Sequence, residues 1–175
     1  MTRRLTGTLA SMLALAAAAG CGGGTDAIAW TDEVCGALTG FTDAVTTQPR
    51  LDASDPVAAV QGLGDYLGST ATALQASISA LDAAGASPVE GGDEYVSRLR
   101  EALTQIRTSF DAARTQLVQV DTSSAASMTA ALPAAVAPLQ ELTDLADPTE
   151  GLRANDELRT AAEQAPNCQR LRGPG

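Results

Sequence analysis

The clearest structural signal in this chain lies in residues 93–120, DEYVSRLREALTQIRTSFDAARTQLVQV. Apolar side chains recur there at steps of three and four residues, the spacing that places them on one face of an α-helix. One helix cannot bury such a seam alone, so we expect it to be the central member of a helical bundle. The apolar face comprises Val96, Leu99, Leu103, Ile106, Phe110, Ala113, Leu117 and Val120.

Two amphipathic segments precede this helix. The first should begin near Ala27, with Thr25 or Asp26 as its cap, and end before Pro49, because proline disfavours helical geometry in the preceding residue. Its apolar face comprises Trp30, Val34, Leu38, Phe41 and Val45.

The second segment has recognisable start and stop signals. Asp55 supplies an acceptor for first-turn amides, and Pro56 has a backbone angle already suited to the first helical position. Gly85 should end this helix, because glycine readily adopts the left-handed conformation found after a helix. Asp93 is then the expected cap of the helix over 93–120.

A fourth helix is expected after a turn at residues 121–124. Pro133 and Pro138 lie inside it and should kink it or divide it, since each removes a backbone hydrogen bond. Its apolar face comprises Met128, Leu132, Val136, Leu139 and Leu142.

The remaining residues predict a short, more polar helical segment. It starts at Asp147-Pro148, turns Leu152, Leu158 and Ala162 inward, and stops at Pro166, before a loose tail at 169–175. The sequence thus predicts one all-α domain over residues 27–168, an up-and-down four-helix bundle plus a short C-terminal helix.

Composition excludes several classes of function. The 175 residues include 21 acidic and 11 basic side chains, a net charge of −10 that nucleic acid would repel. The absence of histidine excludes Ser-His-Asp and Cys-His catalysis and histidine-ligated metals. Together with the lack of a nucleophile motif, this predicts a non-enzymatic protein without a cofactor.

Acidic clusters are the remaining candidates for a metal site. They lack the aspartate spacing of a calcium-binding loop, so we expect solvated acids and acids at helix starts rather than a metal site or an acid–base pair. The clusters are Asp32-Glu33, Glu90 with Asp93 and Glu94, and Asp144 with Asp147 and Glu150.

Residues 1–20 have the order of an export signal: Arg3-Arg4, an apolar run over 5–19, and then small residues. The sequence Ala18-Ala19-Gly20-Cys21 resembles the lipobox of bacterial lipoproteins, with Ala18 where leucine is usual. The resemblance implies cleavage before Cys21 and diacylation of its sulfur, with residues 21–26 as a glycine-rich tether. The sequence favours general secretion over twin-arginine export. The alternative to an export signal is that these residues form a buried, alanine-rich helix of a cytosolic protein.

The lipobox resemblance also implies a disulfide. With Cys21 acylated, Cys35 and Cys168 are left to pair in an oxidising compartment, the alternative being two buried thiols. A second resemblance, to small helical secreted proteins and lipoproteins of actinobacteria mostly without assigned function, rests on Trp30, residues 34–38 (Val-Cys-Gly-Ala-Leu) and Pro166-Asn167-Cys168.

These observations predict a lipoprotein on the outer face of the cell membrane, anchored through Cys21. Its body is expected to be a non-enzymatic binding or assembly module that contacts an envelope protein. The alternative is a carrier or sensor of a small apolar ligand held in a groove between helices. An envelope hydrolase is a third and less favoured hypothesis.

Overall fold

The computed structural model describes residues 23–47, 54–124, 126–128, 130, 133, 137 and 150–172. These residues form helices and connecting turns, without a strand among them, which confirms the predicted all-α class. The helices are α1 (Gly23–Thr46), α2 (Pro56–Ala83), α3 (Gly92–Val118), α5 (Glu150–Ala154), α6 (Asp156–Gln164) and α7 (Pro166–Leu171).

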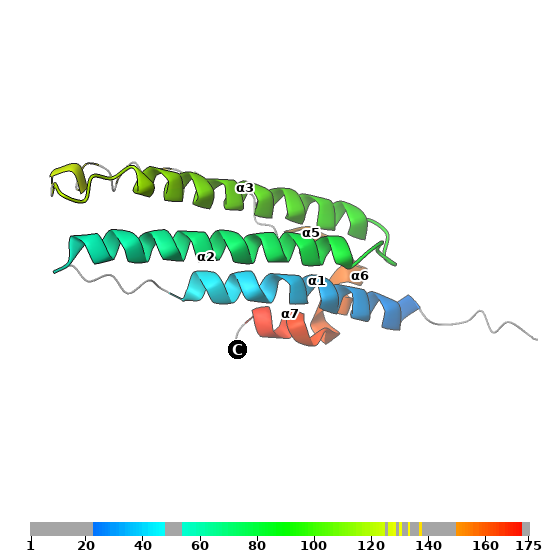
Figure 1. Cartoon of the computed structure of the whole chain (residues 1–175). Coiled ribbons are helices and arrows are strands. Elements are labelled where there is room, and N and C mark those ends of the chain that lie inside the picture. Colours follow the sequence, from blue (N-terminus) through cyan, green and yellow to red (C-terminus); the bar gives the residue numbers. More distant parts are fainter. Residues whose placement is uncertain are drawn as a thin grey trace, which may run out of the picture.

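The three long helices lie side by side, and each runs antiparallel to its neighbour (Figure 1). Helix α2 occupies the middle and packs against both α1 and α3. The short helices α6 and α7 pack against α1, so the C-terminal part of the chain returns to the first helix.

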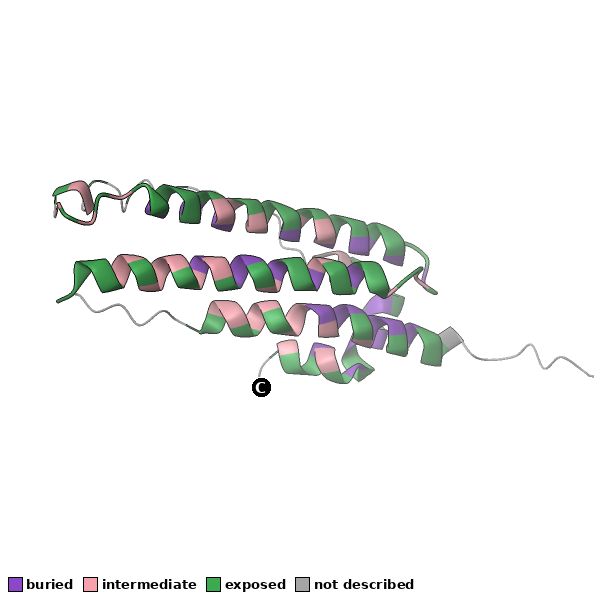
Figure 2. Cartoon of the chain, in the orientation of Figure 1, coloured by how far each residue is buried: buried purple, intermediate pink, exposed green. Residues whose placement is uncertain are grey.

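The predicted apolar faces of α1 and α3 form the core together with the inner face of α2. Along α2, Leu67, Leu74 and Leu81 are each at most 1% exposed, and α3 adds its own seam. Figure 2 shows these buried positions on the facing sides of the long helices. One continuous cluster joins α1, α2, α3 and α6, with Ile106 and Val120 half-buried at its edge.

Several predicted helix ends are confirmed. The carboxylate of Asp55 accepts a hydrogen bond from the amide of Ala58 at 3.0 Å, and Pro56 opens α2. Gly85 follows the end of α2 with a φ of 70°, the left-handed conformation expected of it. Helix α1 ends at Thr46, before Pro49.

The expected cap of α3 was wrong. Gly91, with a φ of 76°, occupies the cap position and makes no side-chain capping bond. The carboxylate of Asp93 instead accepts a hydrogen bond from the amide of Ser87 at 2.8 Å. The left-handed Gly91 places the cap two residues earlier than expected, which leaves Asp93 in the first turn, where it complements the helix dipole.

Both ends of the domain are more helical than expected. Helix α1 begins at Gly23, so residues 23–26 of the expected tether are helical, because extending a helix already anchored by the buried Ala27 costs little. Helix α6 ends at Gln164, before Pro166 as expected, but Pro166 then starts α7, since proline suits the first helical turn. Residues 169–171 of the expected tail therefore belong to a helix.

The predicted turn before the fourth helix is confirmed. The Ser123 hydroxyl (2.6 Å) and amide (2.9 Å) donate to the Asp121 carboxylate, and these two bonds hold the pKa of Asp121 below its usual value. The Ser124 hydroxyl then accepts from the amide of Ser127 at 3.3 Å. Residues 126–128, 130, 133 and 137 are helical, and the rest of the predicted fourth helix, including Pro138, lies outside the described residues.

A buried hydroxyl in α2 leads to a first prediction. Thr70 is fully buried, and its hydroxyl has no hydrogen-bond partner in the described part of the chain. Thr70→Val keeps the side-chain shape and removes an unpaired polar group, so it should raise the free energy of unfolding by about 1 kcal/mol. Urea denaturation measures this, with the exposed Thr72→Val as control, and a lower stability for Thr70→Val would contradict the prediction.

Candidate functional site

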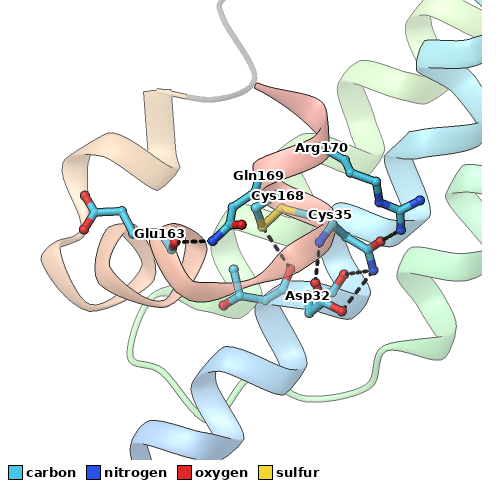
Figure 3. The surroundings of a disulfide bond; sticks show 8 residues. Asp32, Cys35, Glu163, Cys168, Gln169 and Arg170 are labelled. Carbon is cyan, nitrogen blue, oxygen red and sulfur yellow. Dashed lines mark hydrogen bonds between the residues drawn. A yellow bond between two sulfur atoms is a disulfide. The ribbon is translucent and has the colours of Figure 1, made fainter. Parts of the chain in front are cut away.

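Cys35 of α1 and Cys168 of α7 form a disulfide between residues 133 positions apart (Figure 3). Both half-cystines are buried, and the Sγ atom of Cys168 lies 3.5 Å from the carbonyl oxygen of Thr31. The pairing implied by the lipobox resemblance is therefore confirmed, and the alternative of two unpaired thiols is wrong. The bond holds the last helix against the first.

Asp32 gives α7 a second attachment to α1. Its carboxylate accepts hydrogen bonds from the Asn167 backbone amide at 2.7 Å and from the Asn167 side-chain Nδ2 at 3.0 Å (Figure 3). The same Nδ2 donates to the Asp32 carbonyl oxygen at 3.1 Å. The carboxylate of Asp32 in α1 thus accepts a hydrogen bond from a first-turn amide of α7. Such an amide is normally capped by the residue just before its own helix.

Gly36 makes this close approach possible. A Cβ atom at position 36 would lie 2.9 Å from the Nδ2 atom of Asn167, closer than side-chain carbons normally come. The absence of a side chain therefore leaves room for the bonds from Asn167 to Asp32.

The role of Asp32 was missed by sequence reasoning, which placed it among solvated acids. A usable signal was its position one helical turn before Cys35. A bridge from Cys35 to Cys168 brings the neighbouring Asn167 beside Asp32, and asparagine supplies the donors that a carboxylate needs.

The Asp32 contacts lead to a second prediction. Asp32→Ala should lower the free energy of unfolding by about 2 kcal/mol, because hydrogen bonds to a charged acceptor are lost and the α7 amide is left without its partner. Chemical denaturation measures the change, and hydrogen exchange should show faster exchange of the Asn167 amide. The matched control is Glu33→Ala, which alters an exposed neighbouring acid. Equal effects of the two substitutions would contradict the prediction.

A cavity of about 450 Å³ opens beside the disulfide. It is bounded by parts of α1, α3, α5, α6 and α7, and Tyr95 of α3 contributes to one wall. Most of the lining is apolar, which suits the hydrocarbon part of a ligand. The apolar part of the lining is formed by Cys35, Leu38, Leu152, Ala162, Cys168 and Leu171.

The polar part of the lining is mainly cationic. Arg153, Arg159 and Arg172 are the three basic residues of the lining, and Glu163 is the one acidic residue. Arg159 also pairs with Asp156, outside the cavity lining, at 2.7 Å. In a chain with a net charge of −10, this cavity is a local concentration of positive charge.

Sequence reasoning suggested a groove between helices but assigned it to no particular residues. It missed the cavity at the C-terminal helices. The available signal was the cluster of arginines around the second structural cysteine, at positions 153, 159, 170 and 172.

The other candidate residues are dispersed. Cys21, Asp144 and Asp147 lie outside the described residues. Glu94 pairs with Arg98 at 3.7 Å on the exposed face of α3. Within the described ranges, no cluster of three or more Cys, Asp or Glu side chains is arranged to hold a metal ion, and no helix is long and apolar enough to span a bilayer.

Neither a family model, nor a curated protein, nor a solved structure matches this chain. Function is therefore inferred from the chemistry of its own residues.

Proposed function

We propose that this chain is a lipoprotein held on the extracytoplasmic face of the cell membrane by acyl chains on Cys21. Its helical domain is, in this proposal, a non-enzymatic binding or assembly module of the cell envelope. The observation that carries the proposal is how the three cysteines are used. Two of them form a buried disulfide, a bond that persists in compartments outside the reducing cytosol, and the third is the lipobox cysteine.

The position of Cys21 supports an anchoring role. Only Gly22 separates it in sequence from the start of α1 at Gly23, so an acylated Cys21 would hold the first helix close to the membrane surface. Two acyl chains on one residue are sufficient for stable membrane attachment. The domain itself then needs no membrane-spanning helix to remain at the surface.

We further propose that residues 124–147 complete an up-and-down four-helix bundle. Packing of α2 against both α1 and α3 matches the order of the first three helices in such a bundle. Ala130, Pro133 and Ala137 are exposed and share one helical face, whereas Met128 of the predicted apolar face is half-buried. This pattern supports the proposal that the apolar face of the fourth helix is turned toward the other helices.

The chemistry of the domain supports binding rather than catalysis. The chain lacks histidine, and two of its candidate acids, Asp32 and Asp93, accept hydrogen bonds from backbone amides as structural groups. An envelope hydrolase would need a base and a nucleophile within hydrogen-bonding distance of one another. A hydrolase therefore remains the least favoured hypothesis.

The cavity beside the disulfide favours a second candidate function, a carrier or sensor of a small apolar ligand. Its volume of about 450 Å³ falls within the range of small-molecule sites, about 300–1,000 Å³. This candidate is compatible with the same membrane anchor.

The anchor is tested by Cys21→Ser in the producing cell. We expect the variant to leave the membrane fraction or to accumulate as unprocessed precursor, as judged by fractionation and immunoblotting. Gly24→Ser is the matched control, since no atom lies within 4 Å of a Cβ at that position. Unchanged membrane partitioning of Cys21→Ser would contradict the lipoprotein proposal.

The binding role is tested by chemical crosslinking on whole cells. A binding or assembly module should give a discrete heteromeric band that identifies an envelope protein. If the chain is recovered solely as monomer with every crosslinker length tried, the proposal of a binding or assembly module is contradicted. The carrier function would then be the remaining candidate.

A further inference from the structure

We propose that the cavity beside the disulfide binds one molecule of a single-chain anionic amphiphile. The alkyl chain lies on the apolar lining, and the carboxylate or phosphate lies among Arg153, Arg159 and Arg172. This inference rests on the binding role proposed above and deepens its carrier form, but it does not depend on the lipid anchor.

The apolar lining sets the class of ligand tail. Leu38, Leu152 and Leu171 approach the cavity from three different helices, and the disulfide sulfurs add a polarizable, nonpolar surface. An unbranched alkyl chain fits such a surface, because every methylene removed from water contributes to binding. The volume of about 450 Å³ accommodates a single chain and is too small for a two-chain phospholipid.

The cationic lining sets the class of head group. A guanidinium presents parallel N–H donors that match the two oxygens of a carboxylate or phosphate, and these charged hydrogen bonds are the strong ones. The three arginines lie in α5, in α6 and in the residue that follows α7, so three separate segments bring positive charge to the cavity. Glu163 is the one acidic residue in the lining and offsets part of the positive charge, but the three arginines leave a net positive charge for an anion.

Charge also excludes the alternative ligands. A cationic amphiphile would be attracted by the net charge of −10 over the whole surface, but at this cavity it would meet three basic residues and one acidic residue. A neutral alcohol of the same length would gain the apolar contacts and lose the ionic hydrogen bonds. Discrimination between head groups of equal chain length is therefore the direct test.

The experiment uses residues 21–175, the chain expected after cleavage before Cys21, with Cys21→Ser. This chain lacks both the apolar run over 5–19 and the acyl anchor, so that no detergent is needed. Calorimetric titration with decanoate, decyl phosphate, decanol and decyltrimethylammonium, all below their micelle concentrations, compares four head groups on one chain length. We expect both anions to bind at one per chain, at least about tenfold tighter than decanol or the cation. The ratio of decanoate to decyl phosphate affinity then shows whether the site prefers a fatty-acid-like or a phosphate-headed ligand.

Variants locate the binding site. R153Q/R172Q should weaken decanoate binding about tenfold, because it removes two of the three positive charges among the lining residues. The matched control, R107Q/R114Q, removes the same charge from α3 away from the cavity and should leave the affinity within about twofold. L171W should reduce binding by filling the cavity, while circular dichroism confirms that each variant folds. In NMR spectra of the chain without substitutions in the cavity, the Tyr95 ring resonances should shift on addition of decanoate.

Three results would overturn the inference. If all four compounds bind with equal affinity, the cavity is a site for apolar ligands that does not prefer anions. The carrier function would then stand, and the inference of an anionic ligand would fail. Equal weakening by the two double arginine variants would assign the effect to overall charge. Binding of none of the four compounds would overturn this inference and the carrier candidate together, while membrane fractionation of Cys21→Ser would still test the lipoprotein proposal independently.

Discussion

Replacing Cys35 and Cys168 together with alanine should lower the free energy of unfolding by about 4–5 kcal/mol. The bridge closes a loop of 133 residues, so its loss frees a large part of the unfolded chain from constraint. Alanine keeps both buried positions apolar, which separates the loss of the covalent link from the burial of a polar group. Guanidinium denaturation of the double variant, and of the original chain with and without dithiothreitol, measures the effect.

The matched control for this prediction is Cys21→Ser, which removes the cysteine outside the bridge and should leave the denaturation midpoint unchanged. Hydrogen exchange adds a spatial test. Helix α7 should lose protection first, because the bridge is one of its main attachments to α1, whereas α2 and α3 should keep theirs. A loss of less than about 1 kcal/mol would show that the native contacts of α7 hold it without the bond.

The long helices were predictable because their information is local. The spacing of Leu99, Leu103 and Phe110 specifies a buried face without reference to any other segment, and the structure buries all three. Asp55 with Pro56 likewise specifies a helix start through interactions within one turn. Such signals predicted the positions of α1, α2 and α3 to within a few residues.

The C-terminal helices were less predictable because their information is not local. Residues 166–171 contain too little apolar surface to indicate a helix, and they become one through Asp32 and Cys35, more than 130 positions earlier. The sequence indicates the cavity even less clearly. Its three arginines follow no helical period, since they lie in three separate short segments that tertiary packing alone brings together.

Leu158→Ala is expected to lower the free energy of unfolding by about 3 kcal/mol, the usual cost of truncating a fully buried leucine. Leu158 is 0% exposed in α6 and belongs to the main core cluster rather than to the smaller cluster around the disulfide. Its helix has its own attachments: the Asn155 side chain accepts from the amides of Glu157 and Leu158 at 3.0 Å and donates to the Glu90 carbonyl at 2.9 Å. Leu171→Ala, at a half-buried position, is the control and should cost markedly less.

Combining Leu158→Ala with the Cys35→Ala/Cys168→Ala pair shows how the C-terminal helices are held. If α6 packs on the core through its own apolar face, the costs of the changes should add to within about 0.5 kcal/mol. If the disulfide alone held these helices in place, Leu158→Ala would cost almost nothing once the bridge is gone. The core position of Leu158 and the independent Asn155 bonds favour additivity. Additive costs would mean that the cavity walls on α5 and α6 persist when the bridge is reduced.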